Sequence, residues 1–159
     1  MTPRIEFLLP KKIVGLHITM SMQTNKTTDL WRLFMSRRIE VKHRVNSDLI
    51  SLQLYPKAYF ENYNPSVLYE KWATVEVSNF NEVPPNMDTL ILEEGLYAVF
   101  IYKKSESDAE TFFTNIFSDW LPNSDYSLDK RPHFEILGDK YKYNDPNSEE
   151  EVWIPVKLR

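Results

Sequence analysis

The sequence predicts an α+β protein built from two β-α-β-β units, with an antiparallel sheet and two main helices. Each half of the chain has the pattern of a strand, a helix and two further strands. The elements of the two halves recur about 80 residues apart, which indicates an internal repeat. Pro84-Pro85 marks the joint. We therefore expect one domain of residues 1–159, with pseudo-repeats at about 1–80 and 85–159.

The two helices are predicted from their apolar spacing. In residues 109–121, apolar side chains recur at the helical period and form a complete stripe. Ser107 and Glu110 have the spacing of a capping box, and Pro122 ends the pattern. The other helix covers about 29–43, with Thr28 as its expected N-cap.

The strands are predicted from alternation and from apolar runs. Residues 48–55 alternate, with Ile50, Leu52 and Leu54 on one face and Ser51, Gln53 and Tyr55 on the other. Residues 96–102 are apolar on both faces, which is typical of a central strand. The remaining expected strands are 13–20, 72–77, 133–137 and 152–158.

Composition excludes several kinds of chemistry. The chain has 159 residues, of which 3 are glycines. It has no cysteine, which excludes disulfides, a thiol nucleophile and a thiolate zinc site. No glycine-rich phosphate loop or nucleophile-elbow motif is present. His17, His43 and His133 lack the spacing of metal ligands. We expect no metal, no cofactor and no catalytic residue.

The charge pattern bears on possible partners. The net charge is −4, and the single basic cluster, Arg37–Arg44, is interpreted as a solvated helix face rather than a nucleic-acid site. The longest apolar run has seven residues, 96–102, against the roughly 20 that a membrane helix needs. We therefore expect a soluble cytoplasmic protein that contacts neither nucleic acid nor membrane directly.

Glu135 is the residue that the pattern singles out. Alternation within residues 133–137 places it on the face opposite Phe134 and Ile136. If that face meets solvent, Glu135 is an ordinary exposed carboxylate. If the face lines a cavity, the carboxylate lies among rings, because aromatic residues make up 14% of the chain. Such a site favours a cationic ligand, which relieves the cost of the buried anion.

Several segments together resemble the GyrI-like effector-binding domain, which is attached to AraC-type and multidrug-responsive transcription regulators and also occurs alone. The resemblance covers essentially the whole chain. Lys103-Lys104 differs from the Lys-Gly that relatives often have, and no DNA-binding domain accompanies the repeat, so direct promoter binding is not expected. The segments that carry the resemblance are Lys12–Gly15, Lys71–Glu76, Gly95–Phe100, Trp120–Tyr126, Asp129–Glu135 and Glu151–Val156.

The resemblance implies a central cleft for a small molecule, with an acidic residue on the strand after the second helix. Glu135 occupies the matching position. Aromatic walls are also implied, with Trp153 matching an aromatic position of the last strand. The further expected walls are Trp31, Tyr97 and Trp120. The expected ligand is a cationic or aromatic drug-like compound, which the protein sequesters or reports to a partner such as a transcription regulator.

Two other functions stay open from the sequence. Some members of the superfamily resemble hydrolases that open strained electrophilic rings, and there a pocket glutamate such as Glu135 serves as general base. Turnover of excess substrate distinguishes that activity from binding. The other alternative is a protein-interaction module of the gyrase-inhibitor kind, which predicts an exposed patch and little dependence on Glu135.

Overall fold

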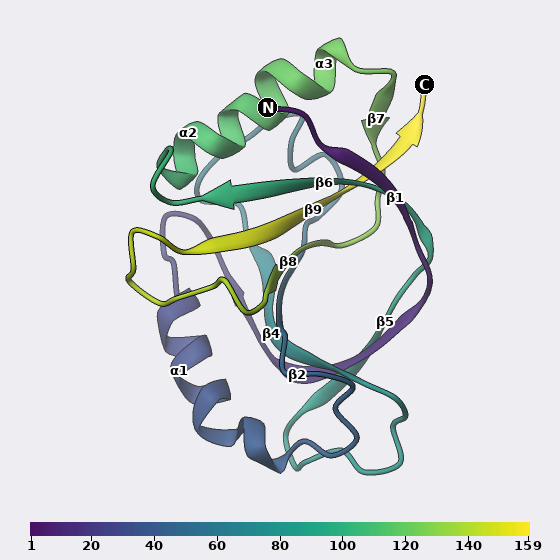
Figure 1. Cartoon of the computed structure of the whole chain (residues 1–159), viewed down its shortest axis with the longest axis vertical. Helices are drawn as coiled ribbons and strands as arrows, with labels where there is room; N and C mark the ends of the chain where they lie inside the picture. The colour runs from purple at the N-terminus through teal and green to yellow at the C-terminus, as the bar shows by residue number, and fades with distance from the viewer.

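The protein, described here by a computed structural model of all residues 1–159, is organised around one curled antiparallel sheet (Figure 1). The strand order is β1-β6-β9-β8-β3-β4-β2-β5, and β7 pairs with β9. The strands are β1 Arg4–Leu8, β2 Lys11–Met20, β3 Leu49–Leu54, β4 Tyr69–Val77, β5 Asp88–Leu92, β6 Gly95–Lys103, β7 Tyr126–Leu128, β8 His133–Leu137 and β9 Glu149–Leu158. The predicted α+β class is confirmed.

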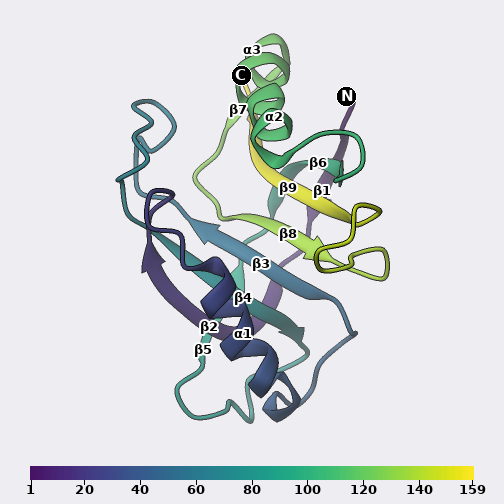
Figure 2. The same cartoon turned by 90° about the vertical axis from the view of Figure 1, so that its left-hand side faces the viewer.

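Two helical segments lie on one side of this sheet (Figure 2). The first is α1, Thr27–Arg37, followed by a 3-10 turn, η1, at Arg38–Glu40. The second runs without a break through α2, Ala109–Thr114, a π-helical stretch, η2, at Asn115–Trp120, and α3, Leu121–Asn123. None of the helices is long and apolar enough to cross a membrane.

The N-terminal caps of both helices differ from the sequence prediction. The helix of the second half begins at Ala109 as expected, but its cap is Asp108, whose carboxylate accepts a hydrogen bond from the backbone N–H of Thr111 at 2.7 Å. α1 begins two residues earlier than expected and has no side-chain cap, so Thr28 lies inside the helix. It also ends at Arg37, before the predicted position 43.

Each half contributes a strand to the sheet of the other half. β1 pairs with β6, and β5 pairs with β2. Arg4 faces Val99 and Gly15 faces Asp88 in the same register, so the two ladders form one long antiparallel pair across the bend between β1 and β2. β1, β5 and β7 were not predicted from the sequence; β1 and β5 are short, and each buries only one residue.

The sheet encloses an apolar core on its inner face. Each helix covers a separate apolar cluster on the outer face. α1 packs on β2 and β4 through Leu30 and Phe34, and α2 with η2 packs on β6 and β9 through Phe112 and Ile116. The inner cluster consists of Leu8, Ile13, Ile50, Leu52, Trp72, Leu92, Tyr97, Val99, Phe134 and Trp153.

Candidate functional site

The central strands β3 and β8 run between the two helices (Figure 2). Their outer face carries polar side chains. Ser51 faces Glu135 and Gln53 faces His133 in the β3–β8 ladder, while Gln53 faces Lys71 on the other side. Side chains directly opposite one another in a ladder share a face of the sheet. We call this group the polar strip; its members are Ser51, Gln53, Lys71, His133, Glu135 and, on β9, Glu150.

Most members of the polar strip are buried although they are polar, and Glu135 and Glu150 are partly exposed. Ser51, Gln53, Lys71 and His133 are each only 5–7% exposed. Buried polar groups normally have hydrogen-bond partners, and those that lack them mark strain, a functional site or an unoccupied partner position. The strip is therefore the place where this fold concentrates buried polarity between two apolar helix–sheet clusters.

Glu135 lies on β8 near the middle of the strip. Its Oε1 accepts a long hydrogen bond from the Gln53 amide at 3.4 Å, and its buried Oε2 has no partner. Burial raises the pKa of Glu135, while the charge of Lys71 and the hydrogen bond from Gln53 lower it. The carboxylate is thus not the solvent-exposed group that one interpretation of the sequence allowed.

Two further charged groups stand on the same face. Burial lowers the pKa of Lys71, and the charges of Glu135 and Glu150 oppose that change. Burial raises the pKa of Glu150 to about 7, with a further contribution from Glu135. These mutual effects show that the strip is one electrostatic unit of a single cation and two carboxyl groups.

Aromatic rings cover the end of the strip where β3 leaves the sheet. Tyr55, the first residue after β3, lies 4.9 Å from the ring of His133 and 5.0 Å from that of Tyr69. Phe60, in the loop that follows, stacks on His133 at 5.1 Å and on Phe117 of η2 at 4.7 Å. The loop between β3 and β4 therefore reaches across to the helix of the second half and closes this end with rings.

Burial among these rings changes the pKa values of His133 and Tyr55. The pKa of His133 falls to about 3, because burial disfavours the charged imidazolium. The pKa of Tyr55 rises well above its usual value, first through burial and second through the charge of Glu135. At neutral pH this end of the strip thus presents a neutral imidazole and a phenol beside the carboxyl group of Glu135.

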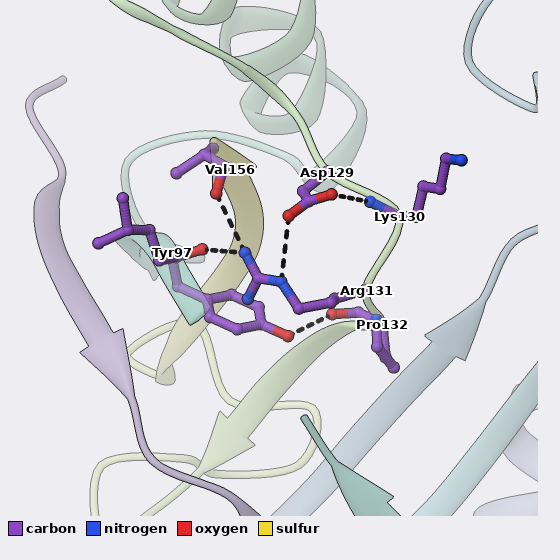
Figure 3. A network of polar contacts seen from close by, with 7 residues as sticks. Tyr97, Asp129, Lys130, Arg131, Pro132 and Val156 are labelled. Carbon is purple, nitrogen blue, oxygen red and sulfur yellow. Dashed lines mark hydrogen bonds and ion pairs between the residues drawn. The ribbon is translucent and has the colours of Figure 1, made fainter. Parts of the chain in front are cut away.

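The segment that leads into β8 is held by Arg131 (Figure 3). Its Nη2 donates to the carbonyl oxygens of Leu96 at 2.7 Å and Val156 at 3.0 Å, and its Nε pairs with Asp129 at 3.3 Å. A side chain at Gly95 would overlap the guanidinium. Arg131 thus joins β6 and β9 to the start of the strand that carries Glu135.

Tyr97 belongs to this structural network and not to the polar strip. Its hydroxyl donates to the carbonyl oxygen of Pro132 at 2.9 Å, and the Arg131 guanidinium lies 4.7 Å from its ring centre (Figure 3). Burial raises the pKa of Tyr97 to about 12. Trp153 lies on the same inner face, stacked on Phe134 at 5.2 Å.

The structure therefore does not gather the sequence-predicted site residues around one point. Tyr97 and Trp153 face the inner core, opposite Glu135. Trp31 belongs to α1 and packs against the apolar cluster under that helix, with its ring edge-on to that of Phe34 at 5.8 Å. Trp120 packs on the cluster under η2 and meets Phe100 at 5.2 Å. Of the five predicted residues, Glu135 alone belongs to the polar strip.

Two surface pockets lie outside the covered part of the strip. The larger, of about 370 Å³, is formed by Met1, Trp120 and polar residues of the second helix, and it contains no buried charged group. The smaller, of about 250 Å³, has Glu150 in its wall together with Tyr102, Lys104 and the loop at 141–148. Because Glu150 belongs to the strip, we regard the smaller pocket as the more relevant one.

Sequence reasoning missed most of the residues around Glu135. Alternation in residues 48–55 had already placed Ser51, Gln53 and Tyr55 on one face. Pairing of that strand with the one carrying Glu135 would have revealed the strip, but nothing local in the sequence specifies which strands are neighbours. The remaining missed residues are Phe60, Tyr69, Lys71, Phe117, His133 and Glu150.

Known proteins share this architecture. The sequence matches the GyrI-like small molecule binding domain over residues 1–157. No curated protein is significantly similar in sequence. Solved structures are similar in fold at low identity: SAV2435 bound to tetraphenylphosphonium has 17% identity and a TM-score of 0.70, with 99% of this chain and 94% of that chain covered.

Two further structures extend the comparison. The C-terminal domain of EcmrR has 11% identity and a TM-score of 0.69, with 99% of this chain and 98% of that chain covered. A hydrolase encoded by lin2189 from Listeria innocua has 12% identity and a TM-score of 0.56, with 98% and 92% covered. At such identities the likeness establishes the fold and leaves the ligand and the activity to be argued from the site.

Proposed function

Because this chain belongs to the GyrI-like small molecule binding domain family, we propose that its ligand site is the polar strip and that the ligand is an aromatic compound with a positive charge. The unpartnered Oε2 of Glu135 carries this proposal. A buried carboxylate oxygen without a donor is costly, and a cation bound against it relieves that cost.

The surroundings of Glu135 support an aromatic ligand. Tyr55, Tyr69 and His133 line one end of the strip, with Phe60 and Phe117 above them. Aromatic faces attract cations and stack on planar molecules. The binding of tetraphenylphosphonium, a bulky aromatic cation, by a protein of the same fold gives further support.

The proposed role is that of an effector-binding or sequestering protein in the cytoplasm, formed by one domain of residues 1–159. In this role the protein removes a drug-like compound from solution or presents its bound state to a transcription regulator. The likeness in fold to the C-terminal domain of EcmrR supports the effector interpretation.

Calorimetric titration with tetraphenylphosphonium tests the proposal. Glu135→Gln removes the charge with almost no change in shape, and we expect it to weaken binding at least tenfold, or about 1.4 kcal/mol. Glu149→Gln is the matched control, since Glu149 lies on the adjacent strand β9 outside the strip. Equal affinities of Glu135→Gln and the wild type, or an equal loss in the control, would remove Glu135 from the site.

Hydrolysis of a strained electrophilic compound is a second candidate function. It is favoured by the raised pKa of Glu135 and its free oxygen, which suit a general base, and by the likeness in fold to a hydrolase. A ligand found by titration would be incubated in excess and followed by chromatography. A binder leaves the compound unchanged at one equivalent bound, whereas an enzyme consumes the excess.

A further inference from the structure

Lys71 is the only lysine or arginine among the buried residues, and it lies in the polar strip. It is 7% exposed on β4, directly opposite Gln53. Its ammonium group forms no hydrogen bond and no ion pair with the protein, but it is not among the fully buried polar atoms without a partner, so it keeps some contact with solvent. Because the side chain is largely buried, the ammonium group has lost much of its hydration, and an anionic partner would stabilise it.

Lys71 and Glu135 form no ion pair with one another, and their strands are separated by β3. The strand order is β4-β3-β8, and neighbouring strands lie about 4.8 Å apart, which places the two backbones roughly 10 Å apart. They are also staggered along β3, since Lys71 faces Gln53 while Glu135 faces Ser51. The strip thus holds an ammonium group and a carboxyl group that both have free hydrogen-bonding capacity, and Gln53 lies on the strand between them.

We infer that the ligand of the polar strip is an aromatic zwitterion, with a cationic group against Glu135 and an anionic group, such as a carboxylate, against Lys71. This inference rests on the proposed ligand site and narrows its chemistry. A simple cation would satisfy Glu135 but leave the ammonium group of Lys71 without an anionic partner and close to a second positive charge. A zwitterion supplies the missing partner at both positions.

The other groups of the strip agree with this assignment. Glu150 is the second carboxyl group near Lys71, but burial and Glu135 keep it partly protonated near neutral pH, with a pKa of about 7. Tyr55 and Tyr69 are neutral phenols there. A zwitterionic ligand adds no net charge to the site. A monocation adds one positive charge, which Glu135 and Glu150 must balance in addition to that of Lys71.

Two dyes that differ only in the relevant charge test the inference. Rhodamine 110 is a zwitterion with a free carboxylate, and rhodamine 123 is its methyl ester, a monocation with the same ring system. Both would be titrated at pH 7.5 by fluorescence anisotropy into the wild type, Lys71→Met, Lys71→Arg and Glu135→Gln. Urea unfolding of each variant confirms that it is folded.

The wild type should bind rhodamine 110 at least tenfold more tightly than rhodamine 123. Lys71→Met should abolish that preference, and Lys71→Arg should keep it. Equal affinity of the wild type for both dyes, or a preference that survives in Lys71→Met, would overturn the inference. If both dyes bind equally and Glu135→Gln weakens both, the proposed function stands without the inference. If neither dye binds the wild type, both fail. Should Lys71→Met not fold, the ratio in the wild type decides.

Discussion

At the scale of single residues, the histidine in the aromatic end of the strip sets how the protein responds to acid. His133 is 7% exposed and its pKa falls to about 3, from 6.5 in an unfolded chain. A depressed folded-state pKa contributes stability above pH 6.5, and this contribution is lost as the pH falls towards 3. The loss is about 1.4 kcal/mol for each pH unit within that window.

His133→Phe should remove this loss while keeping the stack on Phe60. We expect the free energy of unfolding of the wild type, relative to the variant, to decline steadily between pH 6.5 and 3. Urea unfolding at half-unit pH steps measures it. The raised pKa values of Glu135 and Glu150 act in the opposite direction in both proteins, so they cancel in the difference. Parallel curves for the two proteins would contradict the assignment of His133 as a neutral buried imidazole.

The position of a residue could be predicted where it depends on its neighbours in the sequence, but not where it depends on contacts between distant strands. The side of the strand on which Glu135 lies follows from alternation, and the structure confirms it. Its neighbours could not be predicted, because Lys71 and Gln53 come from strands that are 64 and 82 residues away in the chain. Tyr97 and Trp153, the expected aromatic walls, lie on the inner face of the sheet. This could not be predicted, because the sequence alone does not fix the register of their strands, and the register decides which side chains share a face with Glu135.

At the scale of elements, β2 depends on a glycine where it pairs with β4. A β-carbon at Gly15 would overlap the carbonyl oxygen of Ala73, so the two backbones approach more closely than any side chain allows. Gly138, in the loop after β8, has room, since the nearest atom to an added β-carbon is a side-chain oxygen of Asp48 at 3.4 Å. Gly138 therefore serves as the matched control for Gly15, because an added side chain meets no close contact there.

Gly15→Ala should lower the free energy of unfolding by about 2–4 kcal/mol through overpacking, while Gly138→Ala should change it by less than about 1 kcal/mol. Thermal and urea unfolding of both variants test this. A stable Gly15→Ala protein would mean that β2 and β4 separate there at little cost, contrary to the tight ladder described above.

The elements that could be predicted were those with long periodic patterns. Both helices and the strands with strong apolar alternation are present near their expected positions. The helix caps were harder, because Ser107-x-x-Glu110 and Asp108-x-x-Thr111 are overlapping patterns one residue apart, and the aspartate accepts the bond. Strand β1 was not predicted from the sequence, and four of its five residues are exposed.

At the scale of the whole molecule, the two halves complete one another. β1 pairs only with β6, and β5 pairs with β2, so neither half retains all its strand partners when separated. Residues 1–84 and 85–159, produced as separate chains, should each fail to fold alone. Mixed in equal amounts, they should form a folded complex, visible by circular dichroism and by size-exclusion chromatography. A folded, monomeric 1–84 chain would contradict this dependence.

The same ladder has a consequence for how fast the chain reaches its native state. Residues 4–15 pair with residues 88–99, so the sheet is completed only when segments from opposite halves of the sequence meet. Closing so long a loop loses chain entropy before the hydrogen bonds compensate for it, and proteins dominated by such distant contacts fold slowly. Until that meeting, β2 and β6 each present an unpaired edge, so the interval between synthesis and closure is the time at which this protein is most exposed to aggregation.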